Sequence, residues 1–156
     1  MSGSEYSVKL YSATMPIPLQ LWSHIYFVTE HASKLNRIEF LGYEKEHHPS
    51  RVYERIFKNY LPPEMGFRIM STAIFWDIGP RFGVKLIKEV AGGVSSPAHK
   101  LWDLLENGGF KNYPFMNQYN MVLGPNSNTF TQWVIDQVPE CGLKLPWNAW
   151  GKGYKE

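Results

Sequence analysis

The chain has 156 residues, the length of one ordinary domain, and we expect residues 1–156 to form a single domain. Hydrophobic residues make up 44% of the chain and charged residues 19%, which excludes a disordered chain and allows a sizeable core. The net charge is only +2 and no run of Lys or Arg occurs, so no nucleic-acid partner is predicted. The single cysteine, Cys141, excludes an internal disulfide and a multi-cysteine zinc site. No metal or other cofactor is predicted.

The N-terminus lacks the basic segment and apolar core of a signal peptide. No apolar run approaches the roughly 20 residues that a membrane-spanning helix needs. These observations predict a cytoplasmic protein.

The pattern of apolar residues in the first third of the chain predicts strands. Residues 6–12 alternate as a short strand does, and residues 19–29 form a nearly continuous apolar run that contains His24. Such a run is typical of a strand that is buried on both faces. After a turn, residues 37–41 form the next predicted strand, which carries Glu39 and is antiparallel because the connection is short.

The middle of the chain is predicted from turn and spacing signals. Residues 44–49 read as a polar loop, and its adjacent His47 and His48 do not by themselves make a metal site. Ser50 is a predicted cap for a short helix, because apolar residues follow at spacings of four: Val52, Ile56 and Tyr60. Residues 66–76 alternate as a third strand.

Two further helices are predicted before the C-terminal third. The first lies within residues 77–93, on the spacing of Phe82, Leu86 and Val90. Its basic residues, Arg81, Lys85 and Lys88, predict either a solvated outer face or contact with a membrane surface. The second begins at Ser96-Pro97, where Ser is a good cap and Pro a good first residue.

The motif GPNSNTF, residues 124–130, predicts a tight turn that leads into a helix ending before Pro139. Thr129 and Gln132 fit a capping box, and Ser127 and Asn128 are also good cap residues. A helix N-terminus has unpaired N–H groups, so it can cap itself, bind an anion or hold a nucleophile beside an oxyanion site. The tail that follows, with Trp147 and Trp150, is expected to pack back on the domain, and contact with a membrane interface is the alternative.

Acyl transfer by a side-chain nucleophile needs a base that reaches the nucleophile and a third group that orients the base. We predict that Ser127 at the helix start, His24 in the buried strand and Glu39 on the adjacent strand meet in this way. This requires two segments that lie far apart in the sequence to share one cleft, with the helix on the face to which His24 and Glu39 point. Backbone N–H groups near Asn128, helped by the Asn126 side chain, would hold the oxyanion.

The GPNSNTF motif, followed by Val138-Pro139-Glu140 and a Gly-Lys-x-Tyr ending, resembles an uncharacterised, mostly bacterial domain-of-unknown-function family. The resemblance covers roughly the last third of the chain, and the strands with His24 and Glu39 fit it more loosely.

The order of elements also resembles the circularly permuted papain-like fold of lecithin:retinol acyltransferase and related hydrolases. This resemblance implies an α+β fold, with helices packed on an antiparallel sheet. It also implies a catalytic site in which His24 is the histidine, Glu39 the orienting residue and Ser127 takes the place of the family's cysteine. A serine hydroxyl must lose its proton during attack, whereas a thiol is partly ionised near neutral pH. Two functions stay open: a hydrolase or acyltransferase acting on a small molecule, lipid or peptide, and a binding protein without catalysis.

Overall fold

The computed structural model describes residues 5–14, 22–42, 48–65, 68–70, 75–77 and 83–155, and all structural statements refer to these residues. His47, Arg81, Phe82 and parts of the predicted segments 19–29 and 66–76 lie outside them.

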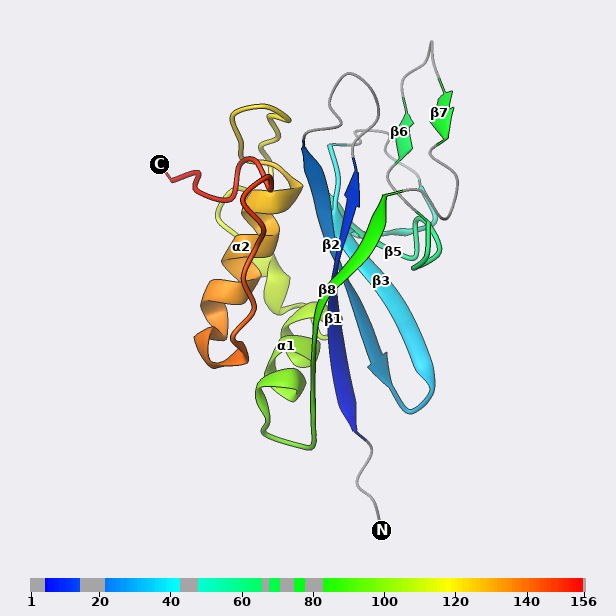
Figure 1. Ribbon diagram of the computed structural model, residues 1–156, viewed down its shortest axis with the longest axis vertical. Helices are drawn as coiled ribbons and strands as arrows, with labels where there is room; N and C mark the ends of the chain where they lie inside the picture. Colours follow the sequence, from blue (N-terminus) through cyan, green and yellow to red (C-terminus); the bar gives the residue numbers. More distant parts are fainter. Residues whose placement is uncertain are drawn as a thin grey trace.

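A six-stranded antiparallel sheet with two helices packed on it forms the body of the protein (Figure 1). The strand order is β4-β5-β3-β2-β1-β8, and a separate pair, β6-β7, forms a two-stranded sheet. The predicted α+β class and the antiparallel sheet with helices on it are therefore confirmed. The strands are β1 (Tyr6–Thr14), β2 (Ser23–His31), β3 (Lys34–Phe40), β4 (Arg51–Tyr53), β5 (Ile56–Lys58), β6 (Arg68–Met70), β7 (Phe75–Asp77) and β8 (Val84–Gly92). The helices are α1 (Pro97–Glu106), α2 (Ser127–Gln137) and the short 3-10 turns η1 (Gly109–Asn112) and η2 (Pro139–Cys141).

The main core lies between the sheet and the helices. Successive side chains of a strand point to opposite faces, so alternate residues in the central parts of β1, β2 and β3 reach this core. These residues pack with the apolar faces of α1 and α2, and the largest of them are buried almost completely: Leu10, Ile25, Phe27, Ile38, Phe40, Leu101, Leu105, Phe130 and Val134.

The other face of the sheet is also covered beside β2. Tyr26 and Val28 pack with Ala13 there, and the Tyr26 hydroxyl donates to the carbonyl of Pro63 at 2.7 Å. Residues 62–65 therefore lie over this face. The described part of β2 is buried on both faces, as the apolar run predicts.

Two predicted helices are strands in the structure. The helix expected after Ser50 is the hairpin of β4 and β5, with Glu54 at φ +34° between them. The helix expected within residues 77–93 is β8, which pairs with β1 at the sheet edge. An apolar residue at every fourth position satisfies the period of two as well as that of 3.6, so the spacing could not distinguish the two structures. Residues 84–92 are not helical. The predicted amphipathic helix, on which the alternative of membrane contact depended, is therefore wrong.

Both remaining helices are confirmed, with one correction at a cap. Ser96 Oγ accepts the N–H of His99 at 3.2 Å and caps α1, as predicted. Helix α2 begins earlier than Thr129: the N-cap is Asn126, and its capping box pairs Asn126 with Thr129. The predicted pairing of Thr129 with Gln132 is therefore wrong, because the Thr129 hydroxyl accepts the Asn126 N–H at 3.0 Å.

Candidate active site

The site forms where β2 and β3 separate. Their pairing ends at Phe27 and Ile38, beyond which β3 pairs only with β5. The exposed edge of β2 would leave backbone groups unpaired. Asn128 supplies the partners, since its Oδ1 accepts from the Ile25 N–H at 3.0 Å and its Nδ2 donates to the Ser23 carbonyl at 2.8 Å. The carboxamide of one residue thus replaces a neighbouring strand.

This arrangement brings Ser127 to His24. Helix α2 packs on the face of the sheet that carries Ile25, whereas His24 points to the opposite face, so the expectation that both share one face is wrong. The groups meet nevertheless because the N-terminal end of α2 lies at the open edge of β2, near the start of that strand (Figure 1). Ser127 Oγ lies 2.9 Å from His24 Nδ1.

Glu39 completes a hydrogen-bonded row of three side chains. His24 Nε2 lies 2.7 Å from Glu39 Oε2. Ser127 is 6% exposed, and His24 and Glu39 are each 2% exposed. All three residues predicted for catalysis therefore lie together, with Ser127 at one end and the carboxylate at the other.

Arg37, which was not predicted for the site, binds the same carboxylate oxygen of Glu39 as His24 does. Its Nη2 donates to Glu39 Oε2 at 2.9 Å, and its Nη1 donates to the carbonyls of Pro62 and Met65 at 3.1 and 2.6 Å. The guanidinium lies 3.6 Å from the centre of the Tyr26 ring. The sequence did contain a signal for Arg37, because residues two apart on a strand point to the same face and Arg37 lies two residues before Glu39.

The charges of this cluster balance when His24 is neutral. Burial alone would raise the pKa of Glu39, but the charge of Arg37 and the hydrogen bonds from His24 and Arg37 together hold that pKa below its usual value. Burial lowers the pKa of His24, and Glu39 offsets this only in part. A protonated His24 would add an unbalanced positive charge to a buried, neutral Arg–Glu pair.

A small pocket opens at Ser127, with a volume of about 20 Å³, comparable to the space of one water molecule. Its lining residues are Trp22, Ser23, His24, Tyr119, Met121, Asn126, Ser127, Asn128 and Trp150. Tyr119 is the second residue of the site that was not predicted, and it lines this pocket together with Ser127. It belongs to a loop without periodic pattern, so the sequence contains no signal that places it there.

Asn126 and Asn128 line the pocket, but their polar groups already have partners. The Asn128 N–H donates to Asn126 Oδ1 at 3.0 Å, and Asn126 Nδ2 donates to the carbonyl of Met121 at 3.1 Å. Their assignment to an oxyanion site stays a prediction. The Ser127 N–H is the adjacent backbone donor at the start of the helix.

The C-terminal tail packs against the site, although of its two predicted packing residues Trp147 is 80% exposed and Trp150 is 45% exposed. The Ser23 N–H donates to the Asn148 carbonyl at 3.1 Å, and Thr129 Oγ1 donates to the Gly151 carbonyl at 2.7 Å. Trp150 lies against Trp22 with ring centres 4.5 Å apart. Cys141 is buried and belongs to the main core.

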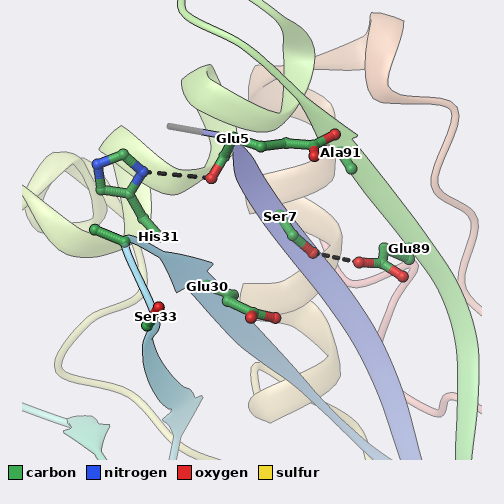
Figure 2. A pocket seen from close by; sticks show the side chains of 8 residues that line it. Glu5, Ser7, Glu30, His31, Ser33, Glu89 and Ala91 are labelled. Carbon is green, nitrogen blue, oxygen red and sulfur yellow. Dashed lines mark hydrogen bonds between the residues drawn. The ribbon is translucent and has the colours of Figure 1, made fainter. Parts of the chain in front are cut away.

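A larger cavity of about 580 Å³ lies at the other end of β1 and β2 (Figure 2). It contains none of the residues predicted for a site. Ser7, Glu30 and Glu89 point toward it, and Ser7 Oγ donates to Glu89 at 2.6 Å. Lys9 lies 2.8 Å from Glu30 and 3.9 Å from Glu89, so it offsets part of this acidic charge.

Neither a metal site nor a membrane span is found in the part of the chain that the structure describes. No group of three or more His, Cys, Asp or Glu there is arranged to hold a metal ion. No described helix has the length and apolar character to cross a bilayer. His48, from the predicted polar loop, packs against Phe57 and Tyr60.

Fold and site together define an α+β protein in which the N-terminus of a helix presents a serine to a histidine–carboxylate pair. The chain belongs to the DUF3750 family of proteins of unknown function, whose profile matches residues 5–154. No curated protein and no solved structure matches the chain. The family of unknown function suggested by the C-terminal motif is thus shown, and the papain-like architecture stays a prediction.

Proposed function

We propose that the protein is a hydrolase or acyltransferase in which Ser127 attacks an ester, thioester or amide carbonyl. The observation that carries the proposal is the buried row of hydrogen bonds from Ser127 through His24 to Glu39. A nucleophile, a base within reach and a group that orients the base are what covalent catalysis by a hydroxyl requires.

The protonation states follow from the hydrogen bonds. Glu39 is ionised and can only accept, so His24 Nε2 carries the proton that is donated to it. His24 Nδ1 is then unprotonated and accepts the Ser127 proton. During attack, Ser127 Oγ bonds to the carbonyl carbon while its proton moves to Nδ1. His24 then gives that proton to the leaving group, and water or an acceptor alcohol releases the acyl group from Ser127 by the reverse transfers.

The order of these residues along the chain supports a permuted papain-like arrangement. His24 lies on an early strand, Glu39 on the next, and Ser127 opens a late helix. Serine in place of cysteine is the departure from that arrangement. It makes the neutral, base-competent state of His24 the central requirement of the mechanism.

The rim of the pocket favours a substrate with an apolar group beside the reacting carbonyl. Trp22, Met121 and Trp150 line the pocket. Next to Met121 along the chain, Val122 is 43% and Leu123 is 75% exposed. A substrate whose carbonyl reaches Ser127 has to pass this apolar rim, so an aliphatic or aromatic acyl ester is the substrate class we propose.

A fluorophosphonate probe tests the nucleophile directly, with mass spectrometry to locate the adduct. We expect phosphonylation of Ser127 in the native protein and none in Ser127→Ala, which should fold normally because it removes one small hydroxyl. His24→Gln should slow the labelling strongly. Modification that persists unchanged in Ser127→Ala would contradict the assignment.

The alternative is a binding protein that uses the same pocket without chemistry. The serine at the nucleophile position and the aromatic rim favour it. Native protein that stays unlabelled by several serine-directed probes, yet binds an apolar fluorophore that Trp150→Ser no longer binds, would favour this alternative over the enzyme.

A further inference from the structure

Exposed apolar side chains concentrate around the pocket at Ser127. Three of them lie in the loop before α2 and two in the C-terminal tail, and we call the five together the rim surface: Met121, Val122, Leu123, Trp147 and Trp150. The other large apolar side chains that are exposed in the described ranges lie one each on β3, β4 and β8 and in the turn that follows β8: Leu35, Val52, Leu86 and Val94. Single exposed apolar residues are ordinary, whereas a cluster of them marks an interaction surface.

The two segments that carry the rim surface are both fixed to the start of α2. Asn126 Nδ2 donates to the Met121 carbonyl at 3.1 Å, and Asn128 Nδ2 donates to the Trp150 carbonyl at 3.0 Å. Met121 and Trp150 both line the pocket, and Trp147 lies in the turn just before Trp150. Figure 1 shows the loop before α2 and the last residues of the chain beside the N-terminal end of that helix. The exposed side chains are therefore presented at one end of the molecule by backbone that is itself hydrogen-bonded.

The charges beside the rim surface are positive. Among the described residues 113–126 and 142–155, the charged side chains are Lys144, Lys152 and Lys155, with no Asp or Glu. Lys152 Nζ donates to the Pro146 carbonyl at 2.9 Å, which holds this cation next to Trp147. Lysine is depleted in protein–protein interfaces, whereas tryptophan is enriched at the membrane–water boundary and lysine is attracted to anionic headgroups. The combination of tryptophan and lysine favours a lipid surface as the partner.

We propose that the rim surface binds a lipid bilayer that contains anionic lipids. Leu123 and the two tryptophans enter the boundary between headgroups and acyl chains, and the lysines of the tail lie near the lipid phosphates. A few apolar side chains and a small positive charge give reversible attachment rather than permanent insertion. The proposal is independent of the chemistry at Ser127, because a protein without catalysis can use the same surface.

Flotation with large vesicles tests the proposal directly, because only bound protein moves upward with the lipid. With phosphatidylcholine vesicles that contain about 30% phosphatidylserine, at low salt, we expect at least about tenfold more bound native protein than with phosphatidylcholine alone. About 1 M NaCl should release most of this protein, since salt screens the attraction between the lysines and the lipids.

Variants separate the rim surface from other exposed apolar residues. Leu123→Ser should lower the affinity for the anionic vesicles about tenfold, the effect of losing one apolar side chain from the bound surface, and adding Trp147→Ser should lower it further. Val94→Ser is the matched control, because Val94 is about as exposed as Leu123 but lies in the turn after β8. We expect that control to bind as the native protein does, and all of these variants to keep the native urea midpoint because the changed side chains are exposed.

A charge reversal separates a local effect from that of net charge. Lys144→Glu combined with Lys155→Glu should reduce binding to the anionic vesicles strongly. Lys34→Glu combined with Lys85→Glu changes the net charge of the protein equally, at exposed positions on β3 and β8, and should reduce binding much less.

The outcomes are distinguishable. Binding that depends on anionic lipid and is lost in the rim variants but not in Val94→Ser supports the proposal. Native protein that floats with neither vesicle, or binding that the Leu123→Ser, Trp147→Ser variant retains, overturns it. Self-association that this double variant abolishes, without vesicle binding, also overturns it and assigns the surface to a second copy of the chain. Ser127→Ala should bind vesicles as the native protein does, so failure of the proposed function leaves this inference intact.

Discussion

The buried pair of Arg37 and Glu39 gives the sharpest test of the electrostatics. Arg37→Met removes the cation and keeps an apolar stem of similar length. Glu39→Gln removes the anion and keeps an oxygen that can still accept from His24 and Arg37, because both donate to Oε2. Each single variant leaves one charge buried without its counter-charge.

The magnitude follows from the geometry. The charged atoms lie 2.9 Å apart and the side chains are 0% and 1% exposed. At an effective dielectric constant of about 20, Coulomb's law gives an attraction of ~6 kcal/mol, much of which offsets the cost of taking both charges out of water. Removing one partner of such a pair costs about 3–5 kcal/mol in the free energy of unfolding.

The assay is a double-mutant cycle by urea unfolding at pH 7.5, followed by the fluorescence of the six tryptophans. We expect the double variant to be no less stable than the weaker single variant, with a coupling energy of at least about 2 kcal/mol. The hydrogen bonds from Arg37 to Pro62 and Met65 are lost with and without Glu39, so they cancel in the cycle. The exposed pair Lys100–Glu140 is the control and should show little coupling. Additive costs, with coupling below about 0.5 kcal/mol, would refute the claim that the two charges depend on each other.

Two further predictions concern the site. Asn128→Ala leaves the buried Ile25 N–H and one carbonyl of β2 unpaired, which should cost about 2–4 kcal/mol in unfolding free energy and speed hydrogen exchange at the Ile25 amide. Asn107→Ala, at an exposed asparagine, should leave both measurements unchanged. The pH dependence of stability follows from the two lowered pKa values. The contribution of His24 is lost as the pH falls below 6.5 through its lowered pKa, and that of Glu39 as the pH falls below 4.5. The free energy of unfolding should therefore decrease on acidification from pH 7, and His24→Gln should lack the part that begins near pH 6.5; a native protein equally stable at pH 7 and 4 would contradict this.

The site residues could be predicted because each had a local signal. His24 is a polar residue in a run of buried apolar residues, where an imidazole needs a partner. Glu39 lies on the following strand, and Ser127 opens a helix that a turn motif marks clearly. What the sequence could not show is how the three meet, because the separation of β2 from β3 and the insertion of Asn128 depend on pairings between distant segments.

The errors lie where the local signal was ambiguous. Within β8, residues at spacings of four fit a strand as well as a helix, and the exposed edge position gives that strand many polar residues. The helix predicted where β4 and β5 form a hairpin is wrong for the same reason. Arg37 could have been found, since it shares a strand face with Glu39. Tyr119 reaches the site through a loop whose course is set by tertiary contacts with Phe40 and Gly42.

The use of Asn128 as a substitute for a strand also links the start of α2 directly to β2. A helix N-terminus that only packed on the sheet could shift by a fraction of an ångström, and a hydrogen bond between a nucleophile and its base is sensitive to such shifts. Here the residue after Ser127 is bonded to β2 through two backbone groups and to the tail through the Trp150 carbonyl at 3.0 Å. His24 lies on the same strand, between those two backbone groups. The nucleophile and the base are therefore positioned by one shared set of hydrogen bonds, so a variant that loosens Asn128 should impair labelling of Ser127 before it unfolds the protein.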